Sequence, residues 1–348
     1  MKPEGNLIEN EIKARAKSLG FQLCGITNSA APQEYPRYKR WIDKGFHGDM
    51  TYLSSSYHME TRRQPEGLFP GVQAIIVVGS AYALPSLSTL PQENIGLFGG
   101  YTAGEDYHQS FPSRLEPLVL FLESLSPSGR RPRIFTDSAP ILERELGSRA
   151  GLGWIGRNSC LISPLIGSGF LLAEIFTDLP LLPDPPFLVD RCGSCQRCVN
   201  ACPTQCILPD RTIDSRRCIS YLTIENRGAI PSWVDQKISH QLAGCDICQV
   251  VCPWNQRSLR NQSFPQENQF DLEEMLKLIG ITAEDFTTRF ANRAVSRVKR
   301  SGLVRNLTIL LKHSGDQRAS QVARDLLLTE KDPLVRNYLE VLLAENDQ

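Results

Sequence analysis

The chain has 348 residues, more than one hydrophobic core usually serves, which predicts two or three domains. Apolar residues make up 41% and charged residues 22%, which excludes a disordered chain, a collagen-like repeat and a coiled-coil rod. Lysine plus arginine equals aspartate plus glutamate, at 38 each, so affinity for a polyanion would require local clustering of positive charge.

The N-terminal half is predicted to combine helices and strands. Apolar residues recur at helical spacing from Leu7 to Leu19, and Gly20 follows where a helix C-cap would lie. Short apolar runs at 74–78, 133–136 and 171–176 have the pattern of buried strands, and residues 111–125 between them have a helical pattern. We therefore expect an α/β domain over residues 1–185.

A proline-rich segment at 180–186 is predicted to be a linker, because proline lacks a backbone donor and restricts the residue before it. A cysteine-rich insert follows at 186–262. From Asp271 onward the strand signals vanish and leucines recur at helical spacing, which predicts a helical tail over 263–348. Its last part, from Asp332 to Leu342, looks like one helical pair of a HEAT-type array.

Apolar runs are short throughout the chain, far below the roughly 20 residues of a bilayer span, and the first thirty residues hold none. We expect a cytoplasmic protein with no membrane partner. Nine of the eleven cysteines fall between Cys192 and Cys252. Dense thiols in a long chain without a secretion signal indicate metal ligation instead of a disulfide scaffold.

The cysteine run Cys192-x2-Cys195-x2-Cys198-x3-Cys202-Pro203 has the spacing of bacterial ferredoxins, where three thiolates bind one cubane and the fourth reaches the other. A second run, from Cys245 to Pro253, repeats this spacing without its first cysteine. Paired zinc sites are the alternative.

The crossover of the fourth thiolate predicts two ligand sets. The first set is Cys192, Cys195, Cys198 and Cys252. The second set is Cys202, Cys245, Cys248 and one more cysteine, either Cys206 or Cys218. We favour Cys218, because it comes from a separate segment and can approach the cluster from a different side.

Six glycines crowd residues 146–170. Such a backbone can pass close to a bulky cofactor or can simply turn between strands, and the sequence favours neither. The letters Gly-x-Gly-x-x-Gly occur at 151–156, but no predicted strand precedes them, which argues against a dinucleotide site.

Several short motifs occur in order along nearly the whole chain. They are Arg62-Arg63-x-Pro65, Asp106-Tyr107-His108, Asp137-Ser138-Ala139-Pro140, Gly153-Trp154-Ile155-Gly156-Arg157-Asn158, the two cysteine runs, Tyr221-Leu222-Thr223-Ile224-Glu225 and Cys252-Pro253-Trp254-Asn255. Together they resemble the motifs of the cobalamin-dependent epoxyqueuosine reductases, a family related in its core to reductive dehalogenases.

The resemblance implies a cobalamin between the α/β domain and a ferredoxin-like insert with two 4Fe-4S clusters, and reduction of epoxyqueuosine to queuosine at the wobble position of a tRNA. With the elements predicted above, we expect an α/β cobalamin-binding domain at 1–185, a ferredoxin-like double 4Fe-4S domain at 186–262 and a HEAT-like, tRNA-binding helical tail at 263–348. An external electron donor is implied, and we expect a monomer. The residues expected to bind the cofactor are Arg62, Arg63, Asp137, Trp154, Arg157, Asn158 and Ser159.

Asp137 is the proton donor that the resemblance implies. Reducing an epoxide to an alkene with loss of water takes two electrons and two protons, so an acid is needed. Because an aspartate is a poor donor at neutral pH, we expect an apolar wall at a strand end to raise the pKa of Asp137, with Tyr107 assisting. A helix N-cap is the alternative role, since Pro140 and Glu143 follow it.

Positive charge gathers in the tail: seven basic residues and no acidic residue lie between Asp285 and Asp316. A solvated helix face is the alternative to phosphate binding. We expect the tRNA contacts to come from Arg297, Lys299, Arg300 and Arg305.

Two other functions stay open. A reductive dehalogenase-like enzyme acting on a small molecule would have no use for this basic stretch, and a ferredoxin-type electron carrier would not need the glycine-rich pocket.

Overall fold

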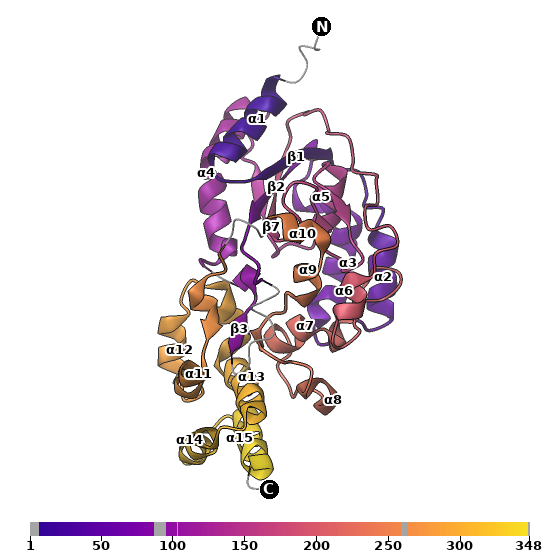
Figure 1. Cartoon of the computed structure of the whole chain (residues 1–348). Helices are drawn as coiled ribbons and strands as arrows, with labels where there is room; N and C mark the ends of the chain where they lie inside the picture. Colours follow the sequence, from indigo (N-terminus) through magenta and orange to yellow (C-terminus); the bar gives the residue numbers. More distant parts are fainter. Residues whose placement is uncertain (1–6, 87–94, 103, 259–262, 347–348) are drawn as a thin grey trace.

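The computed structural model describes residues 7–86, 95–102, 104–258 and 263–346. Helix α1 (Leu7–Ser18) lies at one end of the molecule and helix α15 (Pro333–Asn346) at the other (Figure 1). No helix of these described ranges is both long and apolar enough to cross a membrane.

A four-stranded sheet forms the centre of the N-terminal part, in the order β1-β2-β7-β4. Its strands are β1 (Leu23–Asn28), β2 (Ala74–Ala81), β4 (Arg133–Phe135) and β7 (Phe170–Thr177). Helices α1 and α4 (Tyr107–Leu125) pack on one face, and α5 (Glu143–Arg149) packs on the other. The predicted first helix and the predicted strands are confirmed, and Gly20 has the positive φ of a C-cap.

Strand direction departs from what α/β folds usually show. Each neighbouring pair in this sheet is antiparallel. Apolar runs buried on both faces are typical of parallel sheets, but an antiparallel sheet covered by helices on both faces produces the same pattern. The α/β prediction therefore holds for the layers and not for the direction of the strands.

The proline-rich segment at 180–186 forms neither helix nor strand, as predicted. It is nevertheless fixed to β1. The Asp184 amide donates to the Ile26 carbonyl at 2.9 Å, and the Asp184 carboxylate accepts from the Ile26 amide at 2.8 Å.

A small sheet joins distant parts of the chain. Strand β3 (Gly96–Phe98) pairs with β8 (Gln241–Ala243) and with β9 (Gln269–Phe270). Phe98 is fully buried in the same apolar cluster as the C-terminal helices. Segment 96–98 thus contributes to the C-terminal core although it lies inside the predicted first domain, and the domain limits remain a prediction.

Short elements surround the cysteines and connect the two larger parts. They are β5 (Trp154–Ile155), β6 (Leu161–Ile162), α6 (Arg197–Ala201), α7 (Ile219–Ile224), α8 (Ser232–Asp235), α9 (Ile247–Val250) and α10 (Pro253–Ser258). Two further helices, α2 (Tyr35–Asp43) and α3 (Ser56–Arg63), lie on the same side of the molecule as α6 (Figure 1).

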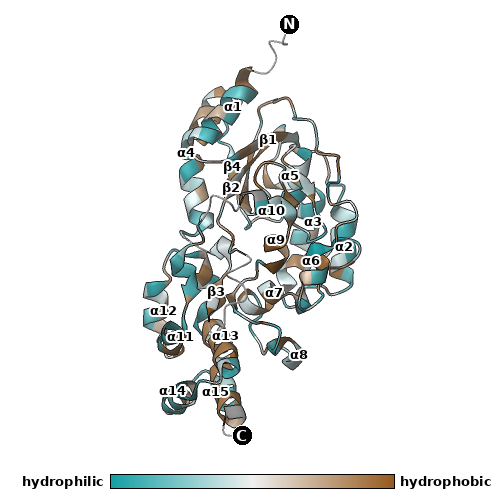
Figure 2. Cartoon of the chain, viewed as in Figure 1, coloured by the Kyte–Doolittle hydropathy of each residue, from teal (hydrophilic) through white to brown (hydrophobic). Residues whose placement is uncertain are grey.

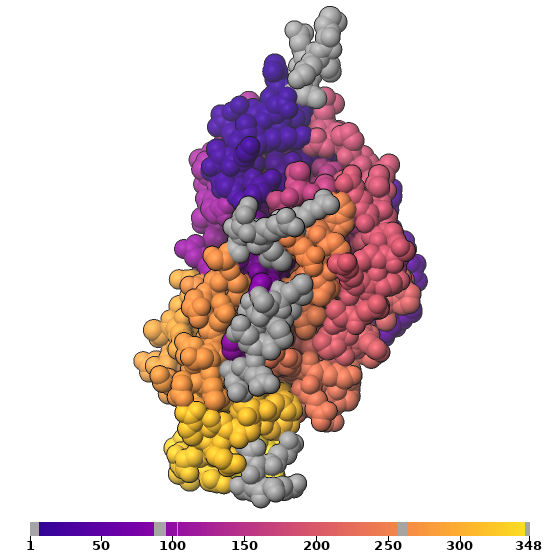
Figure 3. All heavy atoms as spheres, in the orientation of Figure 1, coloured from indigo at the N-terminus to yellow at the C-terminus, as the bar shows by residue number. Residues whose placement is uncertain are grey.

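The C-terminal part is helical, as predicted. Its helices are α11 (Leu272–Leu278), α12 (Ala283–Arg289), α13 (Lys299–Ser314), α14 (Gln317–Leu327) and α15. Ten consecutive residues of α13, from Gly302 to Leu311, are buried, and Figure 2 shows brown along α13 where α14 is mainly teal. The space-filling view shows this tail as one end of the molecule, in orange and yellow (Figure 3). A HEAT-type repeat remains a prediction.

Candidate active site

A cavity of about 610 Å³ lies where the sheet, the cysteine-rich segment and the tail meet. Its walls come from α2 and α3, from the loop after β4, from residues 211–225 and from Arg297. Apolar side chains such as Met50, cationic ones such as Arg62 and acidic ones such as Glu34 all line the cavity. A cavity of this size and mixed lining is typical of a site for a large organic ligand.

Asp137 lies in this wall, two residues after the end of β4. Its φ of 52° is unusual for a residue with a side chain, and such backbone strain gathers at functional sites. Helix α5 begins only at Glu143 and has Leu142 at its N-cap. The helix-capping alternative for Asp137 is therefore wrong.

The Asp137 carboxylate is surrounded by donors. The Tyr107 hydroxyl donates to Oδ2 at 2.8 Å, and His108 Nε2 and Arg297 Nη1 lie 3.5 and 3.6 Å from the same oxygen. Burial acts to raise the pKa of Asp137, but the contacts with His108 and Tyr107 and the charge of Arg297 outweigh it. The pKa of Asp137 is thus lowered, and the predicted raised pKa is wrong, because polar groups face the carboxylate where we expected an apolar wall.

His108 is held on both sides of its ring. Its Nδ1 lies 2.5 Å from Asp106 Oδ1, and its Nε2 lies 2.6 Å from the Arg297 guanidinium. Asp106 is also the N-cap of α4, where it accepts from the His108 amide. Helix α4 therefore presents Tyr107 and His108 to Asp137 in a fixed arrangement.

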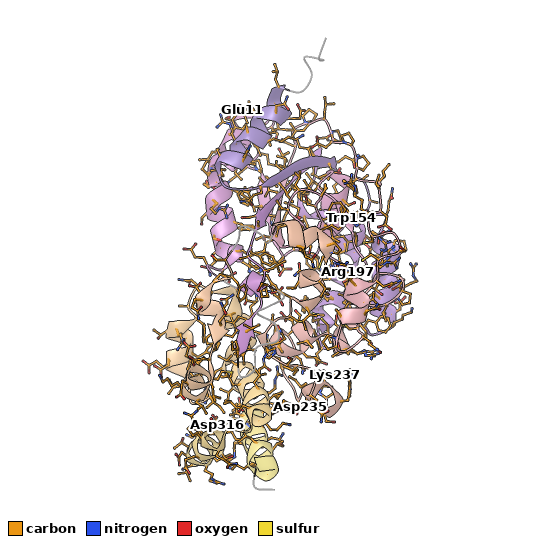
Figure 4. All side chains as sticks on the ribbon, in the orientation of Figure 1. Glu11, Trp154, Arg197, Asp235, Lys237 and Asp316 are labelled. Atoms are coloured by element: carbon orange, nitrogen blue, oxygen red, sulfur yellow. The ribbon has the colours of Figure 1, made fainter. Side chains whose placement is uncertain are left out.

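The thiols of the first predicted ligand set line one separate cavity of about 290 Å³, together with Arg157, Arg191 and Arg197. These thiols are Cys192, Cys195, Cys198 and Cys252. The Trp154 indole N–H donates to Cys192 Sγ at 3.4 Å, and Figure 4 labels Trp154 and Arg197 in this region. The structure thus brings together the four cysteines that the crossover rule groups.

The second group of thiols holds one member more than the four that a cubane binds. Cys202 and Cys206 have their sulfurs 3.4 Å apart, and Cys218 and Cys248 pack against the same cluster. Cys245 lies near Cys218, whose charge contributes to a raised pKa of Cys245 after the larger effect of burial. Cys218 also lines the large cavity. Of the five thiols, Cys218 thus connects this group to the cavity that contains Asp137.

The predicted cofactor residues separate into three places. Arg62, Asp137 and Ser159 line the large cavity, whereas Arg157 and Asn158 line the cavity of the first thiol set. Trp154 is buried beside Cys192. Arg63 lines neither cavity, and its guanidinium forms an exposed ion pair with Glu60 at 2.6 Å.

Glycines of the glycine-rich stretch allow close packing within the protein. A Cβ on Gly153 would lie 2.0 Å from the Ile162 carbonyl oxygen, and one on Gly167 would lie 1.9 Å from Asn255 Oδ1. These two glycines let β5 approach β6 and let the next loop approach α10. At these positions the packing interpretation is correct.

The four predicted tRNA contacts differ in their surroundings. Arg305 is fully buried, and its guanidinium donates to the carbonyls of Leu222, Asn226 and Gly228 at 2.7 to 2.9 Å. The prediction that Arg305 contacts tRNA is therefore wrong, because its buried guanidinium binds backbone carbonyls inside the C-terminal core.

The other three remain candidates. Arg300 pairs with Glu330 at 2.6 Å, Arg297 faces the large cavity, and Lys299 is exposed.

Two acidic residues near the cavity received no role from the sequence. Glu143 lines the cavity, and its carboxylate accepts a hydrogen bond from the Asp137 amide at 2.6 Å. Glu174 lies behind it in β7 with no exposed surface. A single glutamate inside an otherwise apolar strand was the signal that could have drawn attention to Glu174.

Family models match two segments of the chain. Residues 191–255 match a 4Fe-4S double cluster binding domain, and residues 62–138 match the model described as epoxyqueuosine reductase QueG, DUF1730. The first segment contains every cysteine of the two thiol groups, Cys218 included, and the second ends just after Asp137.

Similar curated proteins carry the same description. The epoxyqueuosine reductase of Xanthomonas campestris is 34% identical over 96% of this chain and 95% of its own length. That of Escherichia coli is 36% identical over 88% of this chain and 81% of its own length.

Solved structures are similar over nearly the whole fold. An epoxyqueuosine reductase with an epoxyqueuosine-modified tRNA-Tyr stem loop has a TM-score of 0.87 at 27% identity, covering 98% of this chain and 90% of its own. The Bacillus subtilis epoxyqueuosine reductase, with its catalytic aspartate loop swung out of the active site, has a TM-score of 0.84 at 27% identity, covering 97% of this chain and 90% of its own.

Proposed function

The chain belongs to the epoxyqueuosine reductase family, and we propose on this basis that it reduces epoxyqueuosine to queuosine at the wobble position of a tRNA. The observation that carries the proposal is that Cys218 and Asp137 line the same cavity. The cysteine that we propose as a cluster ligand and the residue that we propose as the acid thus lie at one cavity, which is what a reductive loss of water requires.

Two 4Fe-4S clusters fit the thiols that the chain provides. The first set lines one cavity, and the second group packs together between that cavity and the large one. We propose Cys218 as the fourth ligand of the second cluster, with Cys206 as the alternative. Electrons would then pass from an external donor through the clusters to the large cavity.

A cobalamin fits the lining of the large cavity. The mixture of apolar and polar side chains suits a bulky ring with polar groups at its edge, and Arg62 and Ser159 would hold that edge. Bound there, cobalamin would supply the redox centre that transfers electrons from the clusters to the substrate carbon.

The protonation step falls to residues of this chain. Asp137 faces the cavity and would protonate the departing epoxide oxygen, while Tyr107 and Arg297 orient its carboxyl group. Because the contacts with His108 and Tyr107 and the charge of Arg297 lower the pKa of Asp137, its carboxylate must gain a proton before or during the reaction. The B. subtilis relative, whose catalytic aspartate loop swings out, supports a loop position for such an acid.

The tRNA is proposed to place its unstacked wobble base in the large cavity, as RNA readers do with bases in loops. Lys299 is exposed and would contact a phosphate directly, while Arg297 reaches the cavity itself. The relative solved with a modified tRNA stem loop supports this substrate class. We propose that the chain acts as a monomer, with the domain limits of the sequence prediction.

The test supplies reconstituted protein with reductant and three possible substrates under anaerobic conditions. These are a stem loop carrying epoxyqueuosine, a halogenated phenol and an oxidised redox protein. Loss of one oxygen from the stem loop, detected by mass spectrometry, is the expected result. Conversion of the phenol alone would indicate the dehalogenase-like function, and electron transfer to the protein alone would indicate the carrier.

A further inference from the structure

Glu174 occupies a position in the sheet that would suit an apolar residue. It has no exposed surface, and strand alternation places it on the same face of β7 as Leu172 and Phe176. That face packs against the apolar side of α5. Among the described residues, none donates a hydrogen bond to either oxygen of the Glu174 carboxyl group. A buried carboxyl group with no donor, whose polar contact is a second acid, Glu143, is costly, so its presence calls for a physical reason.

Glu143 lies between Glu174 and the cavity. It is the first residue of α5, is half-buried, lines the cavity and accepts from the Asp137 amide. Burial, and then the charge of Asp137, raise the pKa of Glu143 to about 7. Burial, and then the charge of Glu143, raise the pKa of Glu174 well above its ordinary value. Carboxyl groups therefore extend from the cavity wall into the core behind Asp137.

The charged groups facing this pair do not neutralise Glu174. Arg144 and Arg62 act on Glu143, while His108 and Arg297 act on Asp137. The ionisable groups that act on Glu174 are Glu143 and Asp137, both acidic. Two neighbouring carboxylates of like charge cannot both stay ionised at low cost, so the pair retains a proton near neutral pH.

We propose that Glu143 and Glu174 share a stored proton, and that Glu143 delivers it towards Asp137 and the substrate during reduction. The inference rests on the proposed function, because reduction of an epoxide to an alkene places two protons on the same oxygen. The pair passes one proton to the ionised carboxylate of Asp137, which donates it to the departing oxygen, and Asp137 then takes the second proton from solvent and donates it in turn. The two electrons come from the external donor through the clusters. The oxygen leaves as water, the pair becomes its anion, and water entering the cavity restores the proton after product release.

The first test asks whether the pair holds a proton. Infrared titration of the reconstituted protein without substrate should show, near neutral pH, the carbonyl stretch of a protonated carboxylic acid that shifts on deuteration. Glu174→Gln should weaken this band by the part that Glu174 carries. A wild-type spectrum without the band near neutral pH, or a band of unchanged intensity in Glu174→Gln, would overturn the proposal.

The second test asks whether the proton is used. Glu174→Gln and Glu143→Gln should each lower the single-turnover rate about 10²-fold, since general acids contribute about that much, and should leave stem-loop affinity unchanged. Both should also lose the wild-type dependence of the rate on pH near neutrality. Glu174→Met, which fills the same space without an amide, provides a second variant if Glu174→Gln does not fold.

Glu145→Gln is the matched control. Glu145 is a buried glutamate on the same helix, but its oxygens accept from the amides of Gln33 and Glu34 at 2.6 and 3.0 Å. This variant should keep the wild-type pH dependence of the rate. If the wild type does not reduce the stem loop, the proposed function fails. If the wild type does and the Glu143 and Glu174 variants keep its rate and pH dependence, only the stored-proton inference fails.

Discussion

The Tyr107 hydroxyl donates a hydrogen bond to Asp137 Oδ2 at 2.8 Å, across the cavity wall between α4 and the loop after β4. A donor to the ionised form of an acid favours that form and lowers its pKa. The resting site therefore keeps Asp137 charged, and the arrangement must change or a proton must be delivered when the substrate binds.

Tyr107→Phe tests this relationship. Removing the hydroxyl should raise the pKa of Asp137, because one of the groups that stabilise its charge is lost. The pH above which the rate falls, as Asp137 loses its proton, should therefore move to a higher value. The phenylalanine ring should keep the packing of α4. The rate of single turnover across pH is the measurement, and an unchanged value would show that this bond does not set the acidity of Asp137.

Cys218→Ala should reduce the iron content from about eight to about four irons per chain, because the second cubane loses a ligand. Cys206→Ala should keep the full complement. Iron and sulfide analysis after anaerobic reconstitution measures both. The reverse result would assign Cys206 as the ligand, a choice that the 3.4 Å contact between Cys202 and Cys206 leaves chemically open.

Arg305→Met should destabilise the fold by about 2–4 kcal/mol, since the carbonyls of Leu222, Asn226 and Gly228 lose their donors inside the core. Urea denaturation of the purified protein measures the loss. Lys299→Ala changes an exposed residue and should stay within about 0.5 kcal/mol of wild type. Equal stability of the two variants would contradict the structural role of Arg305.

Lys299→Ala should instead change tRNA binding. Each lost phosphate contact should lower the slope of log affinity against log salt by about 0.7 to 0.9, and the effect on affinity should be largest at low salt. A salt series of stem-loop affinities measures the slopes of wild type and variant. An unchanged slope would show that Lys299 faces solvent in the complex.

Glu174→Gln should alter how stability depends on pH. Burial, and then the charge of Glu143, raise the pKa of Glu174 in the folded state. Its protonation therefore contributes stability to the folded state. This contribution is complete below the unfolded pKa of about 4.3 and is lost as pH rises towards the folded pKa. Wild type should therefore lose free energy of unfolding relative to Glu174→Gln over the pH interval above the unfolded pKa of about 4.3. Parallel denaturation curves across that interval would contradict a raised pKa.

The spacing of apolar residues and of cysteines along the sequence predicted many of the helices, strands and thiol groups. The strand at 74–78, the first helix and the grouping of Cys192 with Cys252 all follow from local patterns, because periodicity and ligand spacing are written directly in the chain. Strand direction was not predictable in this way, since burial on both faces gives the same apolar run in parallel and antiparallel sheets.

The features that the sequence did not predict depend on contacts between residues far apart in the chain. A count of positive charge could not distinguish buried Arg305 from exposed Lys299, because both occur in the same basic stretch. The low pKa of Asp137 depends on Tyr107, His108 and Arg297, and Arg297 lies 160 residues away in the sequence. The role inferred for Glu174 depends on Glu143 in another element, which periodicity does not place beside it.

The measurement that tests the central claim most directly is a single turnover with prereduced, cofactor-reconstituted protein and a stem loop carrying epoxyqueuosine. Wild type should form queuosine in a molar amount equal to that of the enzyme. Asp137→Asn should bind the stem loop equally well and retain both cofactors, but form product at least about 10²-fold more slowly. A wild type with full cofactor content that forms no queuosine, or an Asp137→Asn variant that matches the wild-type rate, would contradict the account.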